Sequence, residues 1–201
     1  MALYLNGSKL DSILIGDGSG GGSVKPEIVS ALSTPIGSAS NTLSYTFTES
    51  GKFQFYAFKN YANAVQAVDI AITLNGTALT PSTHLESGGS FGMVYGEITV
   101  QAGDVIVASP TTAQSQRGLQ LFIMKNCDVS AFSFLGVTTN NGNTFLINTS
   151  GKSYLQVYQC SYTGGSNLFH YDVMDFQGDS IAVPSGMSKY YYGFTYAIAL
   201  E

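Results

Sequence analysis

The stretch VQAGDVIVASPTTAQSQRGLQLFIMKN, from Val100 to Asn126, aligns without a gap on DFQGDSIAVPSGMSKYYYGFTYAIALE, from Asp175 to Glu201. Further upstream, TFTESGKFQFYAFK aligns on LINTSGKSYLQVYQ. The first two segments are 75 positions apart and the second two are 100 apart, because the first copy has 25 more residues between its Ser-Gly-Lys and Gly-Asp turns. Such self-similarity is typical of a repeated structural unit. We therefore expect an internal duplication.

Apolar and polar residues alternate through most of the chain after residue 38. In LSYTFT, for example, Leu43, Tyr45 and Phe47 share one face of the predicted strand. The other inward-facing sets are Phe53, Phe55 and Ala57; Val68, Ile70, Ile72 and Leu74; Ile98 and Val100; Leu119, Leu121 and Ile123; Leu155 and Val157; and Phe194, Tyr196 and Ile198. Short alternating segments separated by Gly, Asn and Ser predict an antiparallel sandwich or jelly roll.

Helix signals are scarce, and only PEIVSAL, after Pro26, could form a helical turn. The sequence therefore predicts an all-β fold with two small antiparallel β-sandwich, jelly-roll-like units. The first would span residues 27–126 and the second, shorter one residues 127–201. A single sandwich of two interlocked repeats is the alternative.

Residues 1–23 are expected to form an anchoring arm followed by a linker. The segments ALYL and LDSILIG flank Asn6-Gly7, a pair that supplies the positive φ angles of a tight hairpin turn. DGSGGGS, residues 17–23, has the composition of a flexible tether. The candidate anchor residues are Leu3, Leu5, Leu10, Ile13 and Ile15.

The charge balance argues against nucleic acid as a partner. Charged residues are 10% of the chain and the net charge is −5, with no Lys/Arg cluster that could contact phosphates. There is no run of 18 apolar residues, so no membrane insertion is expected. The first residues also lack the pattern of a secretory signal.

No pattern for catalysis, a cofactor or a metal is found. We interpret Asp104 and Asp179, which recur at equivalent places after glycine, as turn residues. His84 lies in a Gly/Ser-rich stretch that favours a solvated loop, and His170 lies in a predicted strand. Cys127 and Cys160 are interpreted as small buried residues, with a disulfide between them as the alternative. The chain is therefore not expected to be an enzyme.

The expected recognition surface consists of Tyr190, Tyr191 and His84. In SKYYYG, alternation places Tyr191 outward, where its ring and hydroxyl suit a sugar or a protein partner. A position in a subunit interface is the alternative. His84 belongs to the longer loop of the first copy, TALTPSTHLESGGSFG, where variable recognition is expected because loops on rigid sandwiches carry function.

The run YTFTESGKFQFYAF, VDIAITLNGTAL, YGEITVQAGDVIVAS and GLQLFIMK resembles the β-sandwich and jelly-roll domains of bacteriophage tail-fibre, receptor-binding and other virion appendage proteins. It is also distantly similar to the trimeric heads of the tumour-necrosis-factor and complement superfamily. The resemblance covers residues 40–126 and, less closely, 141–201. It implies an oligomeric, often trimeric, appendage with an N-terminal virion anchor, and it brings no catalytic motif.

We therefore expect a bacteriophage structural protein of the tail fibre, tail tip or capsid surface that acts by binding, in host attachment. It would be made in the host cytoplasm and assembled into the virion. Its partners would be other virion proteins, through the arm, and a host surface glycan or protein, and a homo-oligomer is expected, with a trimer favoured. A bacterial carbohydrate-binding module or lectin is the main alternative. A pilus-like subunit and a depolymerase are further alternatives.

Overall fold

The computed structural model describes residues 4–5, 8–9, 25–34, 42–61, 68–85, 91–112, 116–127, 129, 133–139, 145–146, 153–161, 167–175, 180–181 and 192–199. Side chains are described mainly between residues 25 and 129, and also at Leu155, Tyr171 and Val173. The structure is all-β with antiparallel sheets, which confirms the expected fold class. This part of the chain contains no helix that is long and apolar enough to cross a membrane.

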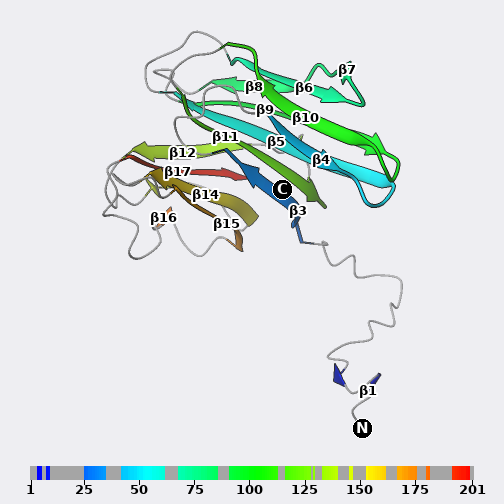
Figure 1. Ribbon diagram of the computed structural model, residues 1–201. Coiled ribbons are helices and arrows are strands. Elements are labelled where there is room, and N and C mark those ends of the chain that lie inside the picture. Colours follow the sequence, from blue (N-terminus) through cyan, green and yellow to red (C-terminus); the bar gives the residue numbers. More distant parts are fainter. Residues whose placement is uncertain are drawn as a thin grey trace.

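The strands form three main sheets, which Figure 1 shows as three stacked layers. The outer sheet has the order β4 (Leu43–Thr46), β10 (Val105–Pro110), β6 (Ile70–Leu74), β7 (Thr77–Ala78). The middle sheet has the order β3 (Glu27–Ser33), β11 (Gln116–Lys125), β5 (Gly51–Tyr61), β9 (Phe91–Val100), β8 (Ser82–Leu85). The third sheet has the order β12 (Ser133–Thr139), β17 (Tyr192–Ala199), β14 (Ser153–Ser161), β15 (Asn167–Asp175).

Two small pairs of strands complete the described structure. β13 (Phe145–Leu146) pairs with β16 (Ser180–Ile181). β1 (Tyr4–Leu5) pairs antiparallel with β2 (Ser8–Lys9), as expected for a hairpin around residues 6 and 7. Asn75 and Gly76, with φ of 51° and 80°, form the turn between β6 and β7.

The first hydrophobic core fills the space between the outer and middle sheets. Most of its residues come from the predicted inward faces, so the alternation in the sequence is confirmed here, and Val94, Ile106 and Ala108 join them. The buried members are Phe47, Phe53, Phe55, Ala57, Ile70, Ile72, Val94, Ile98, Val100, Ile106, Ala108, Leu119, Leu121 and Ile123. Apolar burial on this scale is the main source of stability for such a sandwich.

A second core covers the opposite face of the middle sheet. Tyr56 and Phe58 of β5 and Phe122 of β11 are fully buried there, although they point away from the first core. Leu155 of β14 is buried in the same cluster, and Tyr171 of β15 contacts Phe122 edge to face with ring centroids 5.5 Å apart. The middle sheet is therefore covered on both faces, which explains why β5 and β11 read as nearly continuous apolar runs.

The strand order of the expected first unit recurs in the expected second unit. β3-β11-β5-β9 corresponds to β12-β17-β14-β15, and β4-β10 corresponds to β13-β16. The registers also correspond. In the first unit Leu121 pairs with Ala57. In the second unit Tyr196, 75 positions after Leu121, pairs with Val157, 100 positions after Ala57. The pairing of β14 with β15 differs by two residues from that of β5 with β9. Descent from one duplicated segment, and the division at residue 127, stay predictions.

One local prediction was wrong. PEIVSAL was expected to allow a helical turn, but residues 27–33 form β3, which pairs with β11 along its length. Two neighbouring β-branched residues, Ile28 and Val29, favour a strand. Pairing with a buried neighbouring strand outweighs the weak helix-start signal of Pro26.

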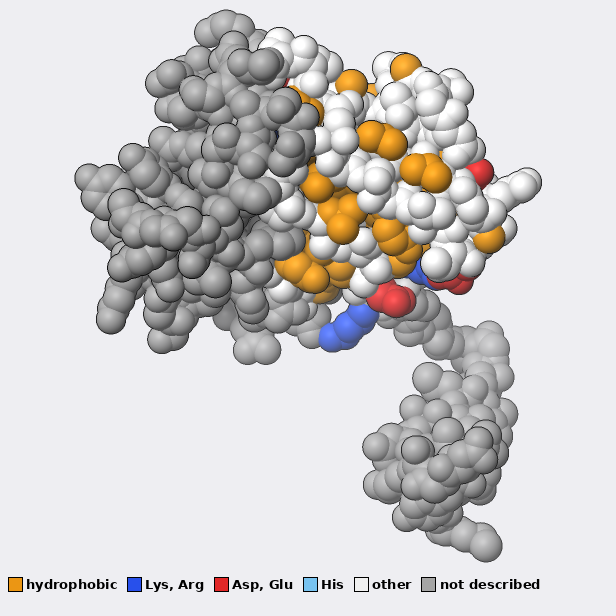
Figure 2. Space-filling view, in the orientation of Figure 1, with side chains coloured by type: hydrophobic (Ala, Val, Ile, Leu, Met, Phe, Trp, Pro, Cys, Tyr) orange, Lys and Arg blue, Asp and Glu red, His pale blue; other side chains and the backbone are white. Residues whose placement is uncertain are grey.

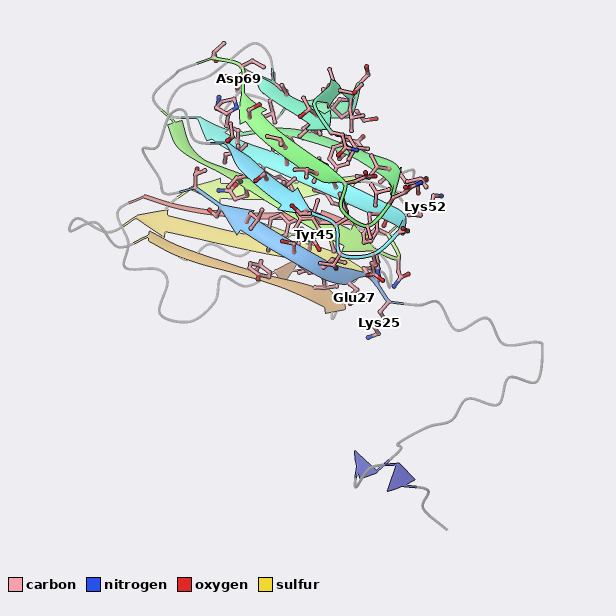
Figure 3. All side chains as sticks on the ribbon, turned by 45° about the vertical axis from the view of Figure 1, so that its right-hand side comes forward. Lys25, Glu27, Tyr45, Lys52 and Asp69 are labelled. Atoms are coloured by element: carbon pink, nitrogen blue, oxygen red, sulfur yellow. The ribbon has the colours of Figure 1, made fainter. Side chains whose placement is uncertain are left out.

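A buried ion pair links the two sheets at one end of the first sandwich. The Lys59 side chain lies on the core face of β5, is fully buried, and places its Nζ 2.5 Å from Oδ2 of Asp69, just before β6. The Thr112 hydroxyl donates to the same carboxylate oxygen, and the Thr111 N–H donates to the Asp69 carbonyl, 2.8 Å away. Asp69 therefore connects β5 of the middle sheet with β6 and β10 of the outer sheet. Figure 3 shows it at the end opposite Lys52.

Asp104 organises the turns at the other end of the outer sheet. Its Oδ2 accepts the Gln101 N–H at 2.8 Å, and its Oδ1 accepts the Asn75 amide at 2.8 Å. The turn role predicted for Asp104 is confirmed by these bonds. The hydrogen bond from the Gln101 backbone, followed by that from Asn75, lowers the pKa of the Asp104 carboxyl below its usual value.

Asp104→Asn is therefore expected to lower the melting temperature at neutral pH, with a difference that depends on pH. Because the folded-state pKa is lowered, the Asp104 carboxylate stabilises the fold above its unfolded pKa of about 4. This stabilisation is lost as the pH falls through the folded pKa. Thermal unfolding followed by circular dichroism between neutral pH and about pH 3 should show the two curves converging. A gap that stays constant over this range would contradict the assignment.

Candidate functional site

A groove lies beside β9 where that strand loses its neighbour on one side. β8 pairs with β9 only between Gly92 and Tyr95, whereas β5 pairs with β9 as far as Val100. The chain crosses from β7 in the outer sheet to β8 in the middle sheet through residues 79–81, next to the free half of β9. The resulting groove has a volume of about 330 Å³ and is open to solvent.

The apolar residues that line the groove are Phe55, Leu79, Ile98 and Val129. Gly96 is required for this arrangement, because a Cβ atom at this position would lie 3.0 Å from two atoms of the Phe55 ring. Phe55 pairs directly with Gly96 across the two strands, and its ring covers the space that a side chain would otherwise fill. A larger residue at position 96 would force that buried ring to move.

Tyr95 is the aromatic residue of the groove. Its ring is half-buried and lies almost parallel to the ring of Tyr56, with centroids 6.4 Å apart and planes inclined by 9°. Tyr56 itself is fully buried in the second core. Because Tyr56 and Tyr95 are direct partners across β5 and β9, the core fixes the orientation of the ring at the groove.

Glu97 is held in place by two donors from β5. Its Oε1 lies 2.7 Å from Nζ of Lys52, and its Oε2 accepts a hydrogen bond of 3.3 Å from the Gln54 amide. The Gln54 carbonyl oxygen in turn accepts the Cys127 N–H at 3.3 Å, and Gln54 is buried. The Glu97 side chain nevertheless keeps 33% of its surface exposed at the groove.

The chemistry of the groove is suited to binding. Thr80 and Ser82 add hydroxyl groups, which can both donate and accept hydrogen bonds. Hydrolysis of a glycosidic bond ordinarily needs a pair of carboxylates, and Glu97 is the one carboxylate among the described residues that line the groove. In the described ranges, no group of three His, Cys, Asp or Glu residues is placed to hold a metal ion.

The structure corrects the prediction for His84. This residue was expected in a solvated loop, but it lies in β8, is half-buried and pairs with Met93. Met93 belongs to the second core, so His84 lies on the face of the middle sheet that faces this core. His84 does not line the groove, which begins two residues earlier at Ser82.

Most of the other predicted site residues have no described position. Tyr190 and Tyr191 lie outside the described residues, as do Leu3, Leu10, Ile13 and Ile15. The backbone of Leu5 lies in β1, opposite Ser8. Cys127 is buried and not part of a disulfide, which agrees with its interpretation as a small buried residue; the side chain of Cys160 lies outside the described residues.

Sequence reasoning missed Tyr95 and Glu97. Both lie in MVYGEITV, where the alternation predicts a strand and marks Ile98 and Val100 as inward. The remaining signal is a glycine between an aromatic residue and a carboxylate inside a strand, which indicates close approach by a neighbouring group.

Comparisons with protein-family models, with curated proteins and with solved structures find no match.

Proposed function

We propose that this chain is a structural protein of a bacteriophage virion, located in a tail fibre, tail tip or capsid-surface appendage, and that it acts by binding during host attachment. The observation that supports binding most directly is the open groove beside β9, on a sheet that is covered on both faces. A site on a rigid scaffold needs little reorganisation when a ligand enters.

The surface of the described residues agrees with this proposal. Figure 2 shows mostly uncharged polar and hydrophobic side chains on the visible described surface, with charged groups near its margins. An appendage that contacts other proteins and host molecules benefits from such a surface, because charged residues are depleted at the centre of interfaces. The resemblance of residues 40–126 to virion appendage domains points the same way.

The arm would connect this body to the particle. Leu3, Leu5, Leu10, Ile13 and Ile15 are the proposed contacts with other virion proteins, and the Gly-rich residues 17–23 are the proposed tether. In this proposal the body forms a homo-oligomer, with a trimer favoured, and Tyr190 and Tyr191 add to the recognition surface.

Deleting residues 1–23 is expected to leave a folded body that is no longer incorporated into virions. The physical reason is that the deletion removes the proposed anchor without touching either core. Incorporation is measured by immunoblotting purified particles, with circular dichroism as the check on folding. The matched control is a chain in which only residues 17–23 are replaced by another Gly/Ser sequence, and this chain should incorporate normally. Normal incorporation of the deleted protein would contradict the anchor.

A bacterial carbohydrate-binding module is the second candidate function. The observation that favours it is the combination of an oriented aromatic ring, a carboxylate and two hydroxyl groups in one groove. The native mass and the association with particles separate the two candidates. A trimer found in virions supports the appendage, whereas a monomer with no particle association supports the module.

A further inference from the structure

We propose that the groove beside β9 binds a neutral sugar unit of a surface glycan, with Tyr95 as the contact plate and Glu97 as the hydrogen-bond acceptor. This inference rests on the proposed function in assuming that the chain acts by binding. It names the ligand class and the residues that would recognise it.

The size and composition of the groove suit a small amphipathic ligand. Its volume of about 330 Å³ is at the lower end of the range for ligand sites. Its lining combines apolar side chains, those of Leu79, Ile98 and Val129, with the hydroxyl groups of Thr80 and Ser82. A pyranose ring likewise combines C–H groups on its face with hydroxyl groups around its rim. A protein partner would need a contact area much larger than this groove.

Tyr95 supplies an aromatic surface whose position is set before the ligand arrives. An exposed part of a tyrosine ring can pack against the C–H face of a sugar, while its hydroxyl reaches a polar neighbour. The stacking of Tyr95 on the buried Tyr56 restricts the ring. Less side-chain entropy is then lost on binding than with a freely rotating side chain.

Glu97 supplies acceptors for sugar hydroxyl groups. An ionised carboxylate accepts hydrogen bonds at several lone-pair positions, and that of Glu97 contacts Lys52 and Gln54 while a third of its side chain stays exposed. Sugar hydroxyl groups can donate to a carboxylate, and hydrogen bonds to a charged group are stronger than those between neutral groups. Because Lys52 and Gln54 hold the carboxylate from the β5 side, it does not have to be reoriented when the ligand enters.

The charge of the site selects against acidic sugars. The carboxylate of Glu97 would repel a uronic or sialic acid group, and the chain as a whole carries a net charge of −5. The nearest described cation, Lys52, already lies 2.7 Å from Glu97. Neutral hexoses and N-acetylhexosamines therefore fit the site better than anionic sugars or phosphate.

The test is a titration of the full chain with neutral saccharides and, in parallel, with uronic and sialic acid saccharides of the same length. Binding is measured by ligand-observed nuclear magnetic resonance or calorimetry. We expect neutral saccharides to bind with a Kd in the millimolar range, typical of a small open site, and acidic ones to bind at least about tenfold more weakly.

Three variants localise the binding. Tyr95→Ala is expected to abolish it, and Glu97→Gln is expected to raise the Kd about tenfold, because a charged acceptor is lost. Thr80→Val removes one exposed hydroxyl and should weaken binding by a smaller factor without changing the fold. Thr83→Val is the matched control, since Thr83 is an exposed residue of β8 outside the groove, and it should bind like the wild type.

Three results would overturn the inference: stronger binding of acidic saccharides, no binding of a broad neutral panel by the folded chain, or unchanged binding after both Tyr95→Ala and Glu97→Gln. Virion incorporation is scored separately, so the two proposals fail independently. Saccharide binding without particle association would leave the groove assignment standing and favour the carbohydrate-binding module. Incorporation without saccharide binding would refute the groove alone.

Discussion

Replacing Asp69 by asparagine should lower the free energy of unfolding by about 3–5 kcal/mol, because it removes the negative partner of an ion pair whose positive charge stays buried. The Lys59 side chain is fully buried, whereas that of Asp69 keeps 12% of its surface exposed. The loss of the carboxylate therefore affects the partner that has no access to water. Urea denaturation measures the effect as a lower midpoint with an unchanged slope.

The opposite substitution provides the comparison. Lys59→Met removes the buried charge, and the Asp69 carboxylate that remains is partly hydrated and still accepts the Thr112 hydroxyl. We expect Lys59→Met to destabilise less than Asp69→Asn, and the double variant to be more stable than Asp69→Asn alone. Lys52→Gln, which breaks an exposed pair, should cost less than about 1 kcal/mol. Equal, small effects of all three single variants would show that the buried pair contributes nothing special.

Phe122→Ala should have an effect of similar size, about 3–5 kcal/mol, because it empties a fully buried aromatic position. Phe122 contacts Phe58 edge to face at 5.8 Å and Tyr171 at 5.5 Å, so it joins the middle sheet to the third sheet. The variant is therefore expected to weaken the contact between these two layers as well as the global fold.

Hydrogen exchange distinguishes this variant from damage to the first core. In Phe122→Ala, amides of β14 and β15 should lose protection before those of β5 and β9. Leu121→Ala is the matched control, since Leu121 is the neighbouring residue of β11, is equally buried and faces the first core. It should reduce protection in the outer sheet instead. Identical exchange patterns for the two variants would mean that the three layers unfold as one unit.

Most of the first sandwich could be predicted from the sequence, because alternation along a strand directly encodes which side chains face inward. Phe53, Phe55 and Ala57 lie in the core as predicted. The same segment also contained the sign of a third layer. Tyr56 and Phe58, on the other face of β5, are too apolar for a solvated surface, and a strand that is apolar on both faces is covered on both.

The groove could not be predicted in the same way. It exists because β8 is shorter than β9 and because residues 79–81 cross between two sheets at that point. Strand lengths and crossover positions depend on tertiary packing, which local patterns do not encode. For Tyr95 and Glu97 the sequence offers only the signal of the glycine between them in a predicted strand. His84 drew attention because of its residue type and lies instead in the half-buried β8.

The placement of β3 at the edge of the middle sheet has a mechanical consequence. Tension applied to the chain ahead of Lys25 enters the body at β3, which is joined to β11 through six residue pairs. Where the pull acts along the strand, these pairs are loaded together in shear, since antiparallel hydrogen bonds lie perpendicular to the strands. The force then passes into the middle sheet, which the two described cores cover on both faces, so we expect this sheet to resist tension applied through β3.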